Sequence, residues 1–328
     1  MATRDGINDY FNGRPFMLLC ALALVAVAAV AFVLGVKPCQ VEETGLLFKV
    51  GDNFFSTRLM SAAANVLALL ATGFIVLGVN KVFTFVRSMT RLVASSFFLL
   101  MLANPSALVS FNAGTLICLM TAVALLPLFA SYQDRHSQRS IFLIFALLAT
   151  GAMFRFGFVL LVPCFLLGFI NMRVMGARGV LAMLIGLFTP FWIVFGLGIA
   201  SPADVTFPRF DALWSMERLT QSAPLYVLAA TVTVLGIVLA LMNLFTVLNY
   251  RQQPRVYNIF LMLMLVLVPI AMCLDDCEMA LFLPLLSLMV SVQIAQAHTL
   301  RKFAHRYVFI LLLIAVCVGA AAYQLLSP

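Results

Sequence analysis

Residues 141–172 read IFLIFALLATGAMFRFGFVLLVPCFLLGFINM, an apolar run with one charge, Arg155, near its centre. Apolar runs of this length are typical of membrane-spanning segments. As one helix, the run would place Arg155 in the hydrocarbon of a bilayer. As two short helices folded back on each other, it would place Arg155 at a turn near one membrane surface. The choice decides the orientation of every later segment, because each crossing moves the chain to the other side.

The composition of the chain is that of a membrane protein. Hydrophobic residues make up 64% of its 328 residues and charged residues only 10%, whereas soluble domains contain roughly 45–50% apolar residues. The net charge of +8 is explained by basic cytoplasmic loops, so we expect no nucleic-acid partner. We predict an all-α, polytopic transmembrane helix bundle that forms one domain over residues 1–328.

Further apolar runs are long enough to cross about 30 Å of hydrocarbon at about 1.5 Å per residue. They lie near 16–36, 59–79, 92–111, 114–130, 180–200, 224–248, 256–274, 279–297 and 307–326. The first follows Arg4 and Arg14 as a signal peptide would, but its length indicates a retained helix. Residues 92–130 as one helix would measure about 58 Å, and Asn104-Pro105, Asn112 and Gly114 supply the turn chemistry for a hairpin there.

The distribution of charges favours two helices, near 141–154 and 156–172, in the central stretch. The chain then has about eleven spans, with the N-terminus cytoplasmic and the C-terminus external. Fourteen of the 20 basic residues fall on inner segments: Arg4, Arg14, Lys81, Arg87, Arg91, Arg135, Arg139, Arg173, Arg178, Arg251, Arg255, Arg301, Lys302 and Arg306. A single central helix removes this bias and buries Arg155 at a cost of roughly 2.5–3.5 kcal/mol.

Arg155 is the first candidate binding residue. Two helices shorter than a full span would hold it below the outer surface, in a thinned or water-filled dip. A guanidinium in such a dip can bind a lipid phosphate through two parallel hydrogen bonds, and Arg58 on an outer segment is a second candidate for this role. The alternative is that Arg155 reaches the headgroups or pairs structurally with a carboxylate.

The predicted outer segments hold the remaining polar chemistry. The first outer loop carries acids, among them Glu43 and Asp52, and residues 201–223 contain an amphipathic stretch that suits a short interfacial helix. The turn Asp275-Asp276-Cys277-Glu278 has the carboxylates for a divalent metal ion. Its Asp-x-x-Glu spacing also matches a capping box, which we favour, so we predict no metal site.

No nucleophile elbow, phosphate loop, dinucleotide glycine pattern or metalloprotease helix occurs in the sequence. Its seven cysteines mostly fall inside apolar runs, where cysteine behaves as a small hydrophobic residue. We therefore expect inert thiols and no cofactor, and the sequence leaves open whether the protein is an enzyme.

The stretches NFFSTRLMSAAANVLALL, FRFGFVLLVP and MGARGVLAMLIGLFTPFWIVFGL, with the Asn80-Lys81 turn, resemble an uncharacterised family of polytopic membrane proteins from Bacteroidota. The resemblance implies a bacterial cytoplasmic (inner) membrane protein and brings no functional residues. The order of spans and outer loops is also similar to that of membrane glycosyltransferases and polysaccharide polymerases that use lipid-linked sugars. That resemblance implies an outer-loop acid, Asp52 or Glu43, acting with Arg155 on a lipid phosphate.

Three functions follow from these observations. The absence of a catalytic signature favours a non-enzymatic membrane subunit or scaffold, whose partner would be another membrane protein. The first alternative is an enzyme that acts on lipid-linked sugar at the outer face, with a polyprenyl-phosphate lipid as ligand. The third is a transporter or flippase, for which the spans offer mainly neutral groups such as Asn65, Asn243 and Gln293.

Overall fold

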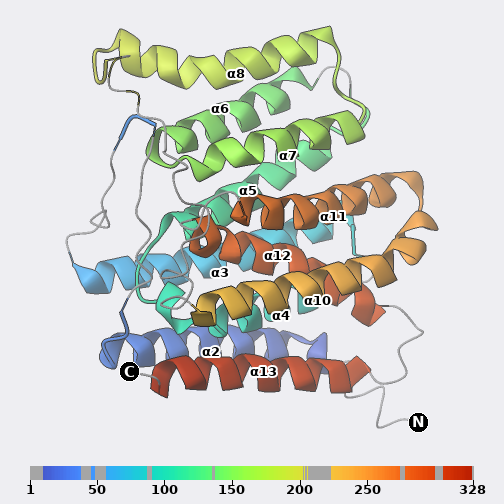
Figure 1. Cartoon of the computed structure of the whole chain (residues 1–328). Helices are drawn as coiled ribbons and strands as arrows, with labels where there is room; N and C mark the ends of the chain where they lie inside the picture. Colours follow the sequence, from blue (N-terminus) through green and yellow to red (C-terminus); the bar gives the residue numbers. More distant parts are fainter. Residues whose placement is uncertain are drawn as a thin grey trace.

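The computed structural model describes residues 10–37, 46–48, 57–86, 91–134, 137–201, 203, 205, 223–273, 278–299 and 306–326. Across these ranges the chain forms helices and no strand, which confirms the predicted all-α bundle (Figure 1). The helices are α2 (Arg14–Val33), α3 (Arg58–Phe83), α4 (Leu92–Leu102), η1 (Pro105–Ala107), α5 (Ala113–Ala130), α6 (Gln138–Phe154), α7 (Gly157–Asn171), α8 (Ala177–Gly196), α10 (Ala223–Leu248), α11 (Gln252–Met272), α12 (Glu278–Thr299) and α13 (Arg306–Leu326).

Eight of these helices are long and apolar enough to cross a bilayer: α2, α3, α5, α8, α10, α11, α12 and α13. Helices α4, α6 and α7 are equally apolar but shorter, with 11, 17 and 15 residues. At about 1.5 Å per residue, α6 and α7 measure roughly 26 and 22 Å. The chain is a multi-pass membrane protein in contact with the lipid bilayer.

The central stretch forms two antiparallel helices, as its charge pattern predicted. Helix α6 ends at Arg155, whose backbone is extended at φ −150° and ψ 124° and whose N–H donates to the carbonyl of Gly151 at 2.9 Å. Helix α7 then returns along α6. A Cβ added to Gly151 would lie 2.5 Å from the ring of Phe158, so the absence of a side chain at Gly151 allows the two helices to meet this closely.

Helix α4 is shorter than the span expected over 92–111. It ends at Leu102 because Asn104, which precedes a proline, has a non-helical backbone (φ −127°, ψ 78°), and Pro105 has no N–H to continue the helix. Residues 103–112 form a turn that contains η1, and every side chain of α4 is buried. Helix α4 is therefore an internal element of the bundle with no lipid-facing side.

Helix α12 lies at the centre of the bundle. It packs against α4, α5, α10 and α11, and every residue of Leu281–His298 is buried. Helix α8 lies at one edge and packs on α6, while α2 and α13 lie at the opposite edge (Figure 1). At the α6–α8 contact, a Cβ on Gly186 would lie 2.7 Å from the carbonyl oxygen of Phe142, so only glycine allows this approach.

Hydrogen bonds show which helix ends lie together. The carbonyl of Met172, after α7, accepts from the N–H of Gln133, after α5, at 3.2 Å. The carbonyl of Phe129 at the end of α5 accepts from the Tyr257 hydroxyl in the first turns of α11 at 2.9 Å. Because α6 starts beside these contacts, Arg155 at its other end lies at the opposite end of the bundle. We call the end of the bundle that contains Arg155 the Arg155 end. We call the end that contains Phe129, Gln133, Met172 and Tyr257 the basic end.

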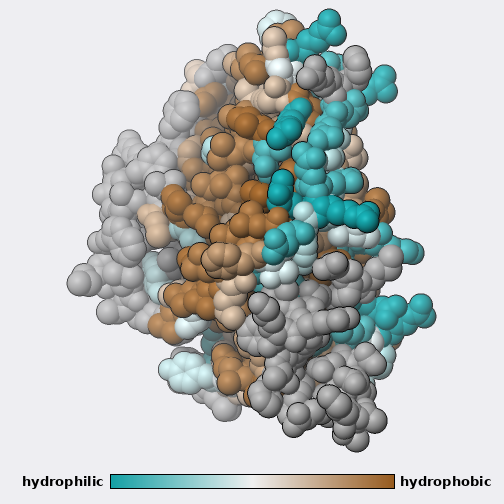
Figure 2. Space-filling model, turned by 90° about the vertical axis from the view of Figure 1, so that its right-hand side faces the viewer, coloured by the Kyte–Doolittle hydropathy of each residue, from teal (hydrophilic) through white to brown (hydrophobic). Residues whose placement is uncertain are grey.

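The basic end carries eight of the eleven basic side chains that the structure describes: Arg14, Lys81, Arg91, Arg139, Arg173, Arg178, Arg251 and Arg255. Figure 2 looks onto this end and shows hydrophilic residues gathered in a band beside hydrophobic ones. The other three, Lys37, Arg58 and Arg155, lie at the Arg155 end. Helix α2 begins at the basic end and α13 finishes at the Arg155 end (Figure 1), so the described helices cross the bundle an odd number of times.

Candidate functional site at the Arg155 end

Arg155 is buried although it lies at a turn. Only 5% of its surface is exposed, and its extended backbone separates the last residue of α6 from Gly157, the first of α7. A charged side chain with so little exposure normally has a polar partner or an ion to offset its lost hydration. The turn therefore holds a desolvated positive charge at the end of the bundle where, among the described residues, only Lys37 and Arg58 are also basic.

Residues of the first inter-helix connection cover this turn. The N–H of Leu46 donates to the carbonyl of Ala152 at 3.2 Å, and those of Leu47 and Phe48 donate to the carbonyl of Met153 at 3.1 and 3.0 Å. The final carbonyls of a helix have no partner within it, so these bonds satisfy the end of α6. The Phe48 ring also stacks on that of Phe154, with centroids 5.2 Å apart.

Arg58, the second predicted binding residue, also lies at the Arg155 end. Its guanidinium donates from Nη2 to the carbonyl of Val36 at 2.8 Å and lies 5.6 Å from the centroid of the Phe32 ring. The preceding Thr57 caps α3 by accepting the N–H of Met60 at 3.3 Å. Arg58 therefore joins the start of α3 to the end of α2. Its side chain remains exposed, and its role in binding a ligand stays a prediction.

The predicted acidic residues fall largely outside the described part of the chain. Glu43 and Asp52 lie outside it, as do Asp275, Asp276 and most of the stretch 201–223. Glu278 begins α12, but its side chain is not described. The roles proposed for these residues as acids, metal ligands or caps remain predictions.

A polar network that was not predicted fastens the turn between α4 and α5. The Nδ2 of Asn65, on α3, donates to the carbonyls of Ala107 and Leu108 at 2.8 and 3.2 Å. Its Oδ1 accepts the Thr115 hydroxyl at 2.6 Å, and that hydroxyl also lies 3.1 Å from Oδ1 of Asn112. Asn65 thereby replaces the helical hydrogen bonds that the turn lacks. The one feature of the sequence that indicated this network was Asn65, a polar residue inside the apolar run 59–79.

A second network surrounds the central helix. Asn243 of α10 donates to the backbone carbonyl of Gln293 at 2.9 Å and to its side-chain oxygen at 3.2 Å. Nearer the basic end, the side chain of Gln296 donates to Asn258, which in turn donates to the carbonyl of Phe85 at 2.7 Å. These neutral groups of the spans thus connect helices α10, α11 and α12 and the segment after α3.

The basic end contains a cavity of about 350 Å³ between the end of α3 and the α10–α11 turn. Its lining residues are Thr84, Asn249, Tyr250, Arg251 and Pro254. The sequence did not predict this cavity, because Thr84 on one wall and Asn249 on the other are more than 160 residues apart in the chain. Arg251 was noted there only as one of the basic residues of an inner loop.

The chain matches no protein-family model, no curated protein and no solved structure. Its functional interpretation therefore depends on the geometry of the described residues.

Proposed function

We propose that this protein is a non-enzymatic subunit or scaffold of the bacterial cytoplasmic membrane. The observation that supports this proposal is the contrast between the centre of the bundle and its edge. The polar side chains of α3, α10, α11 and α12 bond to neighbouring helices, while α8 buries only Gly179 and Gly186. The rest of α8 offers a long apolar face to a partner helix.

The exposed face of α8 has the spacing of a helix-packing surface. Leu181, Ile185, Phe188 and Trp192 recur every three to four residues, and Trp192 is 79% exposed. Residues with this spacing lie on one side of a helix. A partner helix seated there would bury large aromatic side chains, which dominate the energy of many protein interfaces.

The test is site-specific photo-crosslinking in native membranes from Trp192, with Val227 on α10 as the control position because it is exposed to a similar extent. A scaffold predicts one defined protein adduct from Trp192 and none from Val227. The same partner should co-purify in a fixed ratio and be lost on Trp192→Ala. Lipid adducts alone at both positions would exclude this surface as the partner site.

We propose further that the basic end faces the cytoplasm. Cytoplasmic loops of membrane proteins carry an excess of Lys and Arg, and the described basic side chains are concentrated at that end. A reporter enzyme fused after Pro328 should then be active on the external side. Activity on the cytoplasmic side would reverse the orientation.

The second candidate function is an enzyme that acts on lipid-linked sugar, and the observation in its favour is the burial of Arg155. Helices of roughly 26 and 22 Å are shorter than the about 30 Å of a bilayer core, so the turn between them would lie below the headgroups. Polyprenyl phosphate should then co-purify with the protein and be lost on Arg155→Lys, because lysine cannot form the paired contacts of a guanidinium. Arg178→Lys at the basic end is the matched control, and equal retention in both variants would leave the scaffold as the proposed function. No specific observation favours the transporter.

A further inference from the structure

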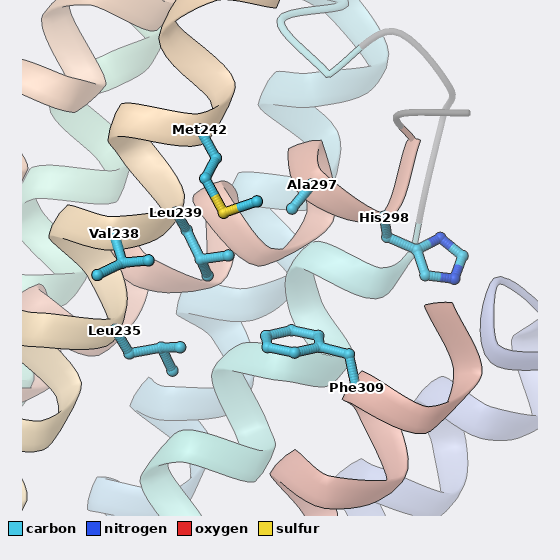
Figure 3. Close-up of a pocket in the computed structure, with 7 residues that line it drawn as sticks. All are labelled: Leu235, Val238, Leu239, Met242, Ala297, His298 and Phe309. Atoms are coloured by element: carbon cyan, nitrogen blue, oxygen red, sulfur yellow. The ribbon is translucent and has the colours of Figure 1, made fainter. Parts of the chain in front are cut away.

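Two openings between helices lie in the half of the bundle near the basic end, and they differ in chemistry. The first is a groove of about 170 Å³ between α10, α12 and α13. Figure 3 shows its lining, in which Leu239, Met242, Phe309 and three further side chains are apolar and His298 is the exception. A lining of this kind suits an acyl chain and an apolar partner helix equally, so we assign no occupant to the groove.

The second opening is the cavity between the end of α3 and the α10–α11 turn, which has the size of a ligand site. Its volume is about 350 Å³, and small-molecule sites occupy roughly 300–1,000 Å³. Thr84 at the end of α3 forms one wall, and residues 249–251 of the turn form the other. The cavity therefore exists only in the folded bundle.

The described lining of this cavity carries a positive charge and no negative one. Arg251 is its charged residue, and Thr84 on the opposite wall adds a hydroxyl group. Both residues are exposed, so an anion outside the bundle can reach them. A guanidinium can bind two oxygens of one phosphate through parallel hydrogen bonds, and a hydroxyl can donate a further one. The chemical class that suits this lining is therefore a phosphate group.

The charges around the cavity also favour an anion. Lys81 lies in the last turn of α3, three residues before Thr84, and Arg255 follows Arg251 by one turn of α11. Of the acidic residues, only Asp134 has a side chain that the structure describes, and it does not line the cavity. An excess of one sign of charge raises the local concentration of ions of the opposite sign, so this part of the basic end attracts phosphate groups.

Exposed apolar side chains lie beside the cavity. The Nδ2 of Asn249 donates to the carbonyl of Phe245 at 3.0 Å, and residues four apart lie on the same side of a helix. Phe245 is 75% exposed, and Val82, two residues before Thr84, is 68% exposed. Both helices are long and apolar enough to cross a bilayer. Their apolar surfaces therefore contact acyl chains, while the cavity at their ends lies at the level of the headgroups.

We propose that the cavity between Thr84 and Arg251 binds a phosphate group, which the guanidinium of Arg251 holds. The adjoining apolar surfaces favour a phospholipid headgroup as its source, and free phosphate is the other source of the same chemistry. The cavity lies at the end opposite Arg155 and shares no residue with the exposed face of α8. This phosphate site therefore goes beyond the proposed function and does not depend on it.

The test uses the full-length protein in neutral detergent, to which phosphatidylglycerol or a diacylglycerol with the same acyl chains is added. Native mass spectrometry should find phosphatidylglycerol bound about fivefold or more over the diacylglycerol, which lacks the phosphate. Arg251→Gln should lower the binding of phosphatidylglycerol to the level of the diacylglycerol. Arg178→Gln is the matched control, because it removes the same charge from an exposed side chain at the same end, and it should leave the binding unchanged.

A second arm distinguishes the two sources of phosphate. Inorganic phosphate in excess should not displace phosphatidylglycerol if the site is built for a lipid. Displacement of the lipid, or binding of inorganic phosphate alone that Arg251→Gln abolishes, would support the site and assign it to free phosphate. Equal binding of phosphatidylglycerol by the two glutamine variants would overturn the proposal. Equal binding of phosphatidylglycerol and the diacylglycerol, with no binding of inorganic phosphate, would overturn it as well.

Discussion

Replacement of Asn65 by leucine should destabilise the protein by several times as much as the same change at an exposed asparagine. Asn65 is fully buried and makes three hydrogen bonds, to the carbonyls of Ala107 and Leu108 and to the Thr115 hydroxyl. Leucine has a similar volume but cannot form these bonds. The two carbonyls would lose their side-chain donor, while Thr115 would keep its contact with Asn112.

The magnitude follows from the number of groups affected. Hydrogen bonds between membrane helices contribute about 0.6 kcal/mol each on average and about 1.7 kcal/mol at most, and a buried group left without a partner costs roughly 1–3 kcal/mol. Three bonds lost from one fully buried site should therefore lower the free energy of unfolding by about 2–4 kcal/mol. The turn between α4 and α5 should loosen first, because Asn65 attaches it to α3.

Thiol labelling of Cys118 measures this change. Cys118 is fully buried on α5, one turn from Thr115, so it reacts only when the helix separates from its neighbours. Its labelling is followed against the mole fraction of SDS in mixed micelles, with the other cysteines replaced by alanine. Asn249→Leu, at an exposed asparagine that bonds only within its own helix, should cost less than about 0.5 kcal/mol.

A double-mutant cycle with Thr115→Ala completes the test. The two changes should be non-additive by about 0.5–1.5 kcal/mol, because each removes the same hydrogen bond. If Asn65→Leu shifts the unfolding transition no more than Asn249→Leu does, the network does not stabilise the turn and the reasoning fails.

Three further outcomes are expected. Gly114→Ala should destabilise the protein by about 1–3 kcal/mol, because the added Cβ would lie 2.4 Å from the carbonyl oxygen of Leu281. Gly78 has open space around it, so Gly78→Ala should stabilise the protein by about 0.5–1 kcal/mol. Equal shifts of the two variants in the same SDS titration would contradict this packing. Thr84→Gly should stabilise by about 1 kcal/mol because Thr84 has φ +47°, a region that costs residues with a Cβ about 1–2 kcal/mol, and a loss of stability would contradict the expectation. Cys273, exposed at the Arg155 end, should react with an impermeant maleimide added outside intact cells when it is the only cysteine present, and protection until the cells are lysed would place that end inside.

The sequence predicted the central hairpin because two of its properties agreed. Only the two-helix arrangement kept most basic residues on one side of the membrane, and it also kept the charge of Arg155 out of the centre of the hydrocarbon. The structure has the break at Arg155, the residue that the argument identified. The candidate site was predicted less completely, because nothing in the sequence indicated that the backbone N–H groups of residues 46–48 bond to the last carbonyls of α6 beside Arg155; the polar dip stays a prediction.

The hydrophobicity of a segment indicates that its helix contacts lipid, but it says little about how helices are arranged inside the bundle. Helix α12 is the least apolar of the eight long helices and is buried throughout Leu281–His298, while only a third of α2, the most apolar one, is buried. Buried helix faces in a membrane protein do not need to match the hydrocarbon, so α12 tolerates Ser291, Gln293 and Gln296. The lower hydrophobicity of α12 was its only sign of a central position in the sequence, and it does not say which helices surround α12.

The amino-acid sequence by itself determined that this protein lies in a lipid bilayer, that it is all-α, and that a helix breaks at Arg155. Hydrophobicity, helix length and charge bias are properties of contiguous segments, so they can be read from the sequence. Only the tertiary structure decided that Asn65 bonds to residues 107, 108 and 115, that α4 is internal, and that α10, α12 and α13 enclose a groove. These features join residues 40 to more than 60 positions apart. Each depends on the packing of particular side chains at helix crossings, where the absence of one Cβ or the presence of one amide decides which surfaces meet.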